Sequence, residues 1–228
     1  MTAEPLENTI LKALYTEVPE LVYDRLVTKP VQTGEVLYEP DNPLIHMIFP
    51  HSGIISLQVV LQDGRTVENM SIGRDSFIGV DYLLGERVTS YHAVVAISGR
   101  ASWLSANDFA AALTACEPLQ DIMRGASRGL LRDLMRGVVC ASVHSASQRV
   151  ATWLLRALDR NDSNHFDITQ RTLANIFGLR LATISDACAR LHAAGAIDHG
   201  RGTMTITDRD TLESQCCECY RDYPRDGR

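Results

Sequence analysis

Apolar residues recur with different periods along this chain, and each period predicts a different kind of structure. From residue 9 to about residue 26 they recur every three or four positions, which predicts two short helices separated at Pro19. From about residue 34 to residue 104, short β-rich runs alternate with glycine and proline. After residue 104 the helical period returns, so a β-rich part is followed by a helical part.

The β-rich part predicts a small antiparallel barrel or jelly roll, because its strands are short and regularly spaced. The strongest hairpin signal is Asp63-Gly64, which separates two alternating apolar runs. The expected strands are residues 36–38, 47–49, 54–61, 66–72, 76–80, 93–97 and 101–104.

A long helix is expected after this part, because Pro118 suits a first helical turn and apolar residues then recur at three and four positions. The spacing approaches heptads, which favours a parallel dimer seam. Packing of the same helix on the barrel within one chain is the alternative. The predicted seam consists of Leu119, Met123, Ala126, Leu130, Leu134, Gly137 and Ala141.

Residues 170–190 have the pattern of two helices that cross through a three-residue turn. Ala174 is small enough for close crossing, Gly178 tolerates positive φ in the turn, and Ile184 faces the first helix. An ordinary helical hairpin is the alternative. Residues 198–206 then predict two short strands around a glycine turn. The whole region is typical of a winged helix-turn-helix that binds double-stranded DNA.

In such a motif the second helix enters the major groove with its N-terminal residues. Arg180 is the candidate for a guanine contact, and Leu181 or Ala182 for a thymine methyl. Asp186 either accepts a hydrogen bond from cytosine N4 or has no base contact, in which case it repels phosphate or pairs with Arg190. Phosphate contacts are expected at the start of the first helix and at the wing tip. The predicted DNA-binding residues are Thr169, Gln170, Arg180, Leu181, Ala182, Thr183, Ser185, Asp186, Arg190 and Arg201.

The net charge of -6 does not by itself suit a DNA-binding protein, since cationic side chains supply much of the affinity for phosphates. The charge is unevenly distributed, however. Residues 1–147 contain 11 basic and 17 acidic residues, whereas residues 148–228 contain 11 of each. The acidity therefore belongs to the first part, and the second is free to present a local basic face.

Other classes of protein are less consistent with the sequence. It contains no Gly-rich phosphate loop, nucleophile elbow or His-Glu-x-x-His helix, so we expect no enzymatic activity. The N-terminus has no apolar signal segment, and the longest uncharged run, residues 42–62, contains two prolines. We therefore expect a cytoplasmic protein without membrane contact. A nucleotide-binding regulatory module without DNA chemistry is the alternative for the first half.

The order of these elements resembles the cyclic-AMP receptor / fumarate-nitrate regulator (CRP/FNR) family over nearly the whole chain. The segments that carry the resemblance are GEVLYEP (34–40), DSFIG (75–79), QRVA (148–151) and ITQ (168–170), which leads to the turn at Gly178. The resemblance implies an α+β fold: an antiparallel β-roll sensor domain (1–116), a long dimerisation helix with a hinge (117–146) and a winged helix-turn-helix (147–228). It also implies a bacterial homodimeric regulator on near-palindromic DNA, with RNA polymerase as a further candidate partner.

The sequence departs from the cyclic-nucleotide binders of this family at the phosphate site. There, a Gly-Glu pair and an arginine eleven residues after the glycine hold ribose and phosphate, whereas here Val80 follows Gly79 and Ser90 replaces the arginine. We therefore expect an unidentified small effector other than cyclic AMP, and no cofactor; effector-independent DNA binding is the alternative. The candidate effector-pocket residues are Gly79, Val80, Ser90, Tyr91 and Arg136. The base-reading Arg-Glu…Arg positions of many members align with Leu181, Ala182 and Asp186, so the operator should differ.

The six cysteines are expected to be thiols in a cytoplasmic protein. The tail CCECY (216–220) resembles a subgroup of the family, and it suggests a thiol- or metal-responsive regulator. Cys216, Cys217 and Cys219 supply three ligands, one fewer than a closed tetrahedral site needs, and Cys140 and His144 lie in another segment. A packed or exposed thiol cluster without metal is the interpretation that the sequence favours.

Overall fold

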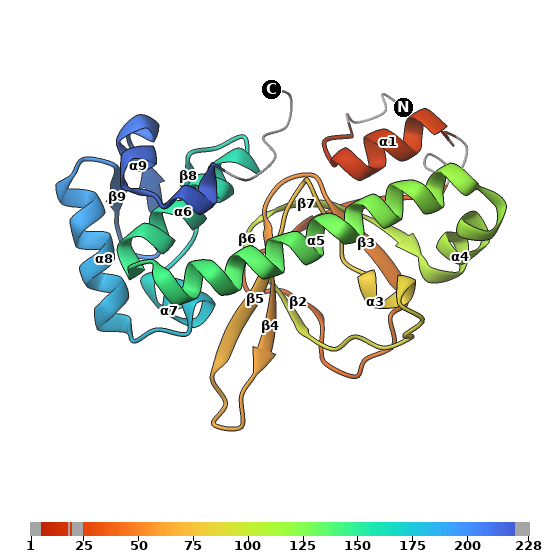
Figure 1. The fold of residues 1–228 in the computed structure, drawn as a ribbon, viewed down its shortest axis with the longest axis horizontal. Coiled ribbons are helices and arrows are strands. Elements are labelled where there is room, and N and C mark those ends of the chain that lie inside the picture. The colour runs from red at the N-terminus through yellow and green to blue at the C-terminus, as the bar shows by residue number, and fades with distance from the viewer. Residues whose placement is uncertain (1–5, 18, 20–24, 222–228) are drawn as a thin grey trace.

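The computed structural model describes residues 6–17, 19 and 25–221. It has the expected α+β fold, in which a β-roll and a winged helix-turn-helix lie along one long helix, α5 (Figure 1). The elements before α5 are α1 (Thr9–Glu17), β1 (Val27–Val31), β2 (Val36–Tyr38), β3 (His46–Pro50), β4 (Ile54–Val60), β5 (Thr66–Ile72), α3 (Val80–Leu83), β6 (His92–Ile97), β7 (Gly99–Ser105) and α4 (Ala106–Ala115). From α5 onward they are α5 (Glu117–Val143), α6 (Ala146–Asp159), β8 (His165–Phe166), α7 (Gln170–Phe177), α8 (Leu181–Ala193), β9 (Ile197–His199), β10 (Met204–Ile206), α9 (Arg209–Gln215) and the 3-10 helix η1 (Glu218–Tyr220).

The β-roll consists of two antiparallel sheets, with strand orders β1-β7-β3 and β2-β6-β4-β5. The predicted hairpin at Asp63-Gly64 is confirmed: Val60 pairs with Thr66, and Gly64 has a φ of 80° that suits glycine. Side chains from both sheets fill the space between them, and Phe49 stacks on Phe77 with 6.0 Å between ring centroids.

Two sequence predictions for the roll differ from the structure. The strand predicted at residues 76–80 is wrong: only Ile78 forms a bridge, to Ile48, and α3 begins at Val80. Gly79, between them, has a φ of 124°, which ends extended pairing. The first strand, β1, has no predicted counterpart, because four of its five residues are exposed and its pattern carries little apolar signal. The second helix predicted before residue 26 falls largely outside the described residues.

The long helix α5 begins at Glu117 with proline in its first turn, as predicted. Its first half packs on the roll: Leu119, Met123 and Leu130 are buried in the same core as the strands. The predicted dimer seam is therefore wrong in this half, because these residues are already used within the chain. The second half carries a different apolar stripe on its exposed face, formed by Leu131, Leu134, Met135, Val138, Val139 and Val143. We call these six residues the α5 stripe.

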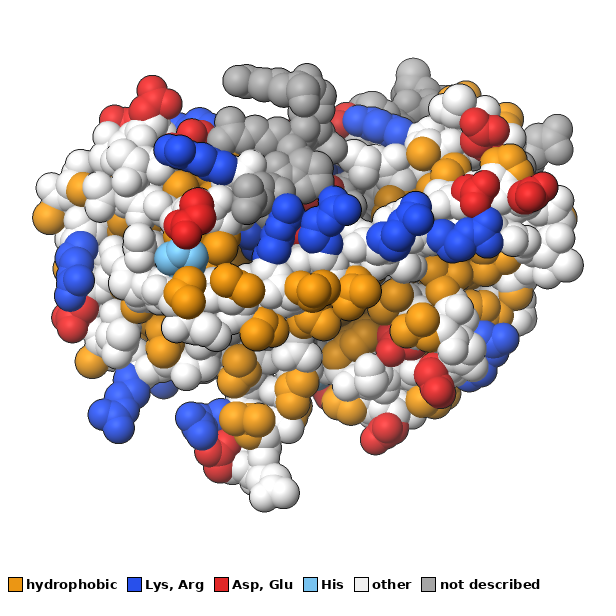
Figure 2. Space-filling model, in the orientation of Figure 1, with side chains coloured by type: hydrophobic (Ala, Val, Ile, Leu, Met, Phe, Trp, Pro, Cys, Tyr) orange, Lys and Arg blue, Asp and Glu red, His pale blue; other side chains and the backbone are white. Residues whose placement is uncertain are grey.

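Figure 2 shows apolar side chains along the second half of α5, below a row of basic side chains on the same helix. The arginines of α5, Arg124, Arg128, Arg132 and Arg136, recur every four residues and therefore lie on one side of the helix. No helix among the described residues is both long enough and apolar enough to cross a membrane.

The winged helix-turn-helix has its own core and also packs on the roll. Its entry helix α6 begins with a capping box, in which the Ser145 and Gln148 side chains each bond the other residue's backbone. Arg160, at the end of α6, forms a 2.8 Å ion pair with Asp75 and donates to the Ser71 carbonyl over 3.1 Å. These contacts hold the helical part against the end of β5.

Candidate functional site

The turn between α7 and α8 has the geometry that the sequence predicts for a helix-turn-helix. Thr169 is the N-cap of helix α7, and its hydroxyl accepts a 2.9 Å hydrogen bond from the Thr172 backbone N–H. It ends at Gly178 in the left-handed conformation, with a φ of 61°. A Cβ at Gly178 would lie 3.0 Å from a methyl group of Val67 on β5, so the turn also lies directly against the roll.

Helix α8 has one buried and one exposed face. Ile184, Ala187, Cys188 and Leu191 are buried against the rest of the winged domain. The predicted base-contacting residues lie mostly on the other face: Arg180, Leu181, Ala182, Thr183, Asp186 and Arg190 are exposed. The N-cap residue is Arg180, and no side chain caps the helix. The first backbone N–H groups of α8 therefore emerge beside an exposed guanidinium, an arrangement that suits an anionic partner.

Two predicted DNA-binding residues bond each other. The Ser185 hydroxyl donates to the Gln170 side-chain oxygen over 2.7 Å, and both residues are half-buried. This bond connects the first turn of α7 with α8 and fixes the crossing of the two helices. Ser185 therefore positions the motif through Gln170.

The wing consists of β9 and β10, and β10 also pairs with β8, so that the three strands form a small antiparallel sheet in the order β8-β10-β9. Arg201 is exposed at its tip, where Gly202 has a φ of 81° and the Gly200 N–H donates to the Thr203 carbonyl over 3.0 Å. Sequence reasoning missed Arg171, which is also exposed, in the first turn of α7. Its position in the sequence could have indicated a phosphate contact, because it directly follows Thr169 and Gln170, for which such contacts are predicted. These arginines add positive charge to the exposed side of the motif.

The predicted effector residues in the roll lie together around α3. Gly79 is buried, and a Cβ there would collide with the Met47 sulfur. The Ser90 hydroxyl donates to the buried Asp81 carboxylate over 3.0 Å. Burial, followed by the neighbouring Asp81 charge, raises the pKa of Tyr91. This corner thus contains a buried carboxylate next to Ser90, the residue that stands at the arginine position of the nucleotide binders.

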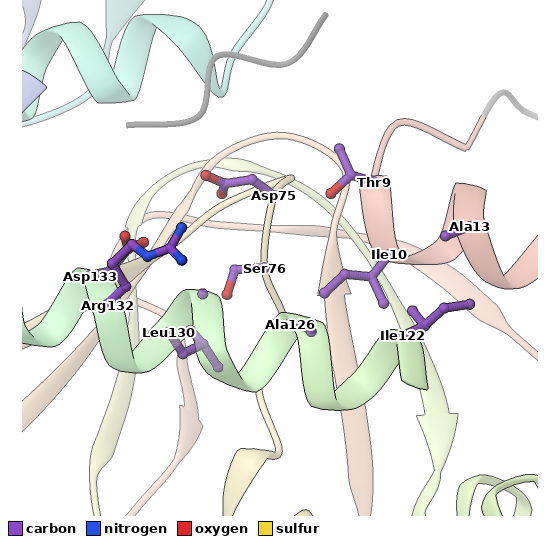
Figure 3. A pocket seen from close by; sticks show the side chains of 12 residues that line it. Thr9, Ile10, Ala13, Asp75, Ser76, Ile122, Ala126, Leu130, Arg132 and Asp133 are labelled. Carbon is purple, nitrogen blue, oxygen red and sulfur yellow. The ribbon is translucent and has the colours of Figure 1, made fainter. Parts of the chain in front are cut away.

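The fifth predicted effector residue, Arg136, lies on α5, half-buried. Two cavities adjoin this helix. One of about 310 Å³ lies between α1, α5 and the segment after β5, and its wall includes Asp75, Ser76, Arg132 and Asp133 (Figure 3). The other, of about 240 Å³, lies between β5, α5, α6 and α7. Both are therefore placed where a bound molecule would contact the long helix and not only the roll.

The cysteine tail is packed against the helical part. Cys217 and Cys219 are buried and Cys216 is half-buried. The tail is anchored by Tyr220, whose hydroxyl donates to Asp159 over 2.8 Å and accepts from Arg209 over 2.7 Å. Hydrogen bonding by the Cys140 thiol, and then by the Thr152 hydroxyl, outweighs burial and lowers the pKa of Cys217 below the ordinary value of a thiol.

Comparisons with known proteins agree with this geometry. Residues 148–215 match the Crp-like helix-turn-helix domain family. The chain is similar to the solved structure of FixK2 from Bradyrhizobium japonicum, with a TM-score of 0.69 and 19% identity over 84% of this chain and 98% of that one. It is also similar to a CRP-family transcriptional regulator from Thermus thermophilus, with a TM-score of 0.68 and 15% identity over 82% and 95% of the two chains.

A third similar structure is the regulator CLP from Xanthomonas campestris, described as responsive to c-di-GMP. Its TM-score is 0.62, with 12% identity over 87% of this chain and 98% of that one. No protein with a curated description matches the chain. At such identities the solved structures support a shared fold, and the domain match supports the helix-turn-helix.

Proposed function

We propose that this chain is a homodimeric transcription regulator, because residues 148–215 match the Crp-like helix-turn-helix domain family and the chain has the fold of CRP/FNR-family regulators. It binds a near-palindromic DNA operator by inserting the N-terminal half of α8 into the major groove. The observation that carries this proposal is the exposed face of α8, which begins at Arg180 and is not covered by the roll.

Support for a dimer comes from the α5 stripe. Met135 is 64% exposed, Val138 63% and Val143 66%, and they recur along one face of the helix. An apolar stripe of this kind is stabilised when a second copy covers it, since burial of apolar area is favourable by about 25 cal/mol per Å². Two copies joined along α5 would present two α8 helices, and these match the two halves of a palindromic site.

The effector of this regulator is a molecule other than cyclic AMP. A cyclic phosphate in the α3 corner would meet Val80 and Ser90 in place of the family's glutamate and arginine, with the Asp81 carboxylate hydrogen-bonded to Ser90. The loss of a charge-assisted guanidinium–phosphate contact and the added carboxylate both disfavour the anion. Isothermal titration calorimetry with cyclic AMP should therefore give no sub-micromolar binding, and a tight, saturable heat signal would contradict this expectation.

The DNA contact is tested by two arginine variants of the full chain. Arg180→Ala removes the proposed guanine contact, so it should weaken binding to a selected operator by about 1–3 kcal/mol and relax preference at one base position. Arg201→Ala removes a proposed phosphate contact, so it should weaken binding to all duplexes alike and reduce the salt slope by about one. Fluorescence anisotropy at several salt concentrations measures both effects.

Arg124→Ala provides the matched control, because Arg124 is an exposed arginine near the start of α5, away from the winged domain. It should bind like the wild type. Equal affinity and equal base preference for wild type and Arg180→Ala would refute the role of α8.

A further inference from the structure

Four side chains that commonly bind soft metals meet at the junction of α5 and the C-terminal tail. They are Cys140, His144, Cys217 and Cys219, and their ligand atoms all lie within 4.8 Å of one another. The Cys140 and Cys217 sulfurs are 3.6 Å apart, and the Cys219 sulfur is 3.7 Å from Nδ1 of His144. Of the three tail cysteines that the sequence offered as ligands, Cys217 and Cys219 belong to the cluster and Cys216 does not. The other two members, Cys140 and His144, come from the end of α5.

The spacing of these atoms matches a tetrahedral zinc site. With Zn–S bonds of about 2.3 Å and a Zn–N bond of about 2.0 Å, tetrahedral angles place neighbouring ligand atoms about 3.5–3.8 Å apart. Both of the separations above fall within this range. Three cysteines and one histidine also form one of the ligand sets that structural zinc sites use. The cluster therefore needs little rearrangement to enclose an ion.

Groups around the cluster orient its members as the outer partners of a metal site do. The other ring nitrogen of His144, Nε2, lies 3.1 Å from the Glu218 carboxylate, which fixes the ring with Nδ1 toward the sulfurs. The Thr152 hydroxyl lies 3.1 Å from the Cys217 sulfur. Arg149 lies near the Cys140 and Cys217 sulfurs, and its charge offsets the excess negative charge of three thiolates around a divalent ion.

We propose that Cys140, His144, Cys217 and Cys219 bind one Zn²⁺ ion in a closed tetrahedral site. The three thiols release their protons to solvent on binding, so the site carries three S–Zn bonds and one N–Zn bond. Cys140 and His144 belong to the end of α5, whereas Cys217 and Cys219 belong to the tail that packs on α6. The ion would thus connect the end of α5 to the tail of the winged domain, across the junction at Ser145 between α5 and α6.

The rival chemistry is a disulfide between Cys140 and Cys217, whose sulfurs are already close. A disulfide would not involve His144 or Cys219. It would therefore not explain why Glu218 holds the His144 ring with Nδ1 toward the Cys219 sulfur. It would also require an oxidant.

The test measures zinc content and coordination in the full-length protein purified under reducing conditions. Mass spectrometry of metals should give about one zinc per chain, and replacement by Co²⁺ should give the visible absorption of a tetrahedral thiolate site. Cys217→Ser and Cys219→Ser should each lower zinc affinity by at least about 100-fold, since each removes a ligand. Glu218→Gln should lower it by about 10–100-fold while keeping the stoichiometry.

Cys216→Ser is the matched control. Cys216 is adjacent to Cys217 in the chain, but its sulfur donates to the Glu213 carbonyl over 3.1 Å and lies outside the cluster. It should retain zinc fully. Wild-type protein that takes up no zinc, a Cys140–Cys217 disulfide in its place, or equal zinc loss in Cys216→Ser would overturn the proposal. The Co²⁺ spectrum of the wild type and the Glu218→Gln variant decide the matter if a cysteine variant fails to fold. None of these readouts involves DNA, so they are independent of the proposed function.

Discussion

The two halves of α5 have similar apolar spacing but different surroundings. In the first half Leu119, Met123 and Leu130 are buried against the roll, and Met123 is only 1% exposed. In the second half the α5 stripe faces solvent, and Met135 is 64% exposed. The first half of the helix therefore belongs to the core of the roll, whereas the second half presents the apolar face that the proposed second copy would cover.

This difference bears on how the proposed effector would act. The cavity of Figure 3 borders α5 from Ile122 to Asp133, and the end of the helix lies next to α6 and the tail cysteines. If the effector binds in this cavity and displaces α5, we expect the contact between the two proposed copies of the chain to change.

The largest effect is expected from charges placed on the α5 stripe. Met135→Glu combined with Val138→Glu would bury two like charges per subunit in the proposed interface, which costs several kcal/mol. Self-association should weaken by at least about 100-fold, and operator binding should fall with it. Sedimentation velocity measures the association. Arg124→Glu, on the same helix but outside the stripe, should leave it unchanged; identical sedimentation of both variants would refute the interface.

A smaller effect is expected when two methionines of the same helix are shortened. Met123→Ala removes a side chain from the packed core, so the free energy of unfolding should fall by about 2–5 kcal/mol. Met135→Ala removes an exposed side chain and should change the free energy of unfolding of the monomer by about 0.5 kcal/mol or less. Chemical denaturation at low protein concentration measures both. Equal losses would mean that the two halves of α5 are not distinct.

The smallest effect concerns pH and the contact between the roll and α6. Burial raises the pKa of Glu68 above its ordinary value of 4.5, although Ser71 and the Trp153 ring nitrogen donate to its carboxylate. Because the pKa of Glu68 is higher in the folded than in the unfolded protein, protonation of this carboxyl group stabilises the fold. This contribution to the free energy of unfolding is fully present below pH 4.5 and is lost as the pH rises through the folded pKa.

Glu68→Gln copies the protonated form, so it should remove this pH dependence. As the pH rises above 4.5, the free energy of unfolding of the wild type should fall relative to that of the variant. Urea denaturation across this pH range tests the expectation. A difference independent of pH would show that Glu68 titrates normally.

The sequence predicted those parts of the fold that depend on local rules. The hairpin at Asp63-Gly64 and the turn at Gly178 each follow from the backbone preference of one or two residues. The strand expected at residues 76–80 was wrong because a short apolar run does not reveal whether a partner strand is available. The side of α5 that faces the roll likewise depends on tertiary contacts.

The proposed metal site could be recognised only in part from the sequence. Cys140 and His144 lie four residues apart at a helix end, and Cys217 and Cys219 lie two apart; each spacing alone is a weak signal. Their proximity depends on the tail folding back over α6, which Tyr220 secures through Asp159 and Arg209. Such a contact joins residues more than 70 positions apart in the chain, and no local pattern encodes it.

Selection of duplexes from a random DNA pool with the full-length protein is the decisive test of a dimer that reads DNA through two copies of α8. We expect an enriched inverted repeat, with half-sites centred about 10–10.5 base pairs apart or at a multiple of this spacing, because the two helices lie on one side of the duplex. Recovery of a single unrepeated half-site, or of no enriched sequence at all, would show that the protein does not bind DNA in this way.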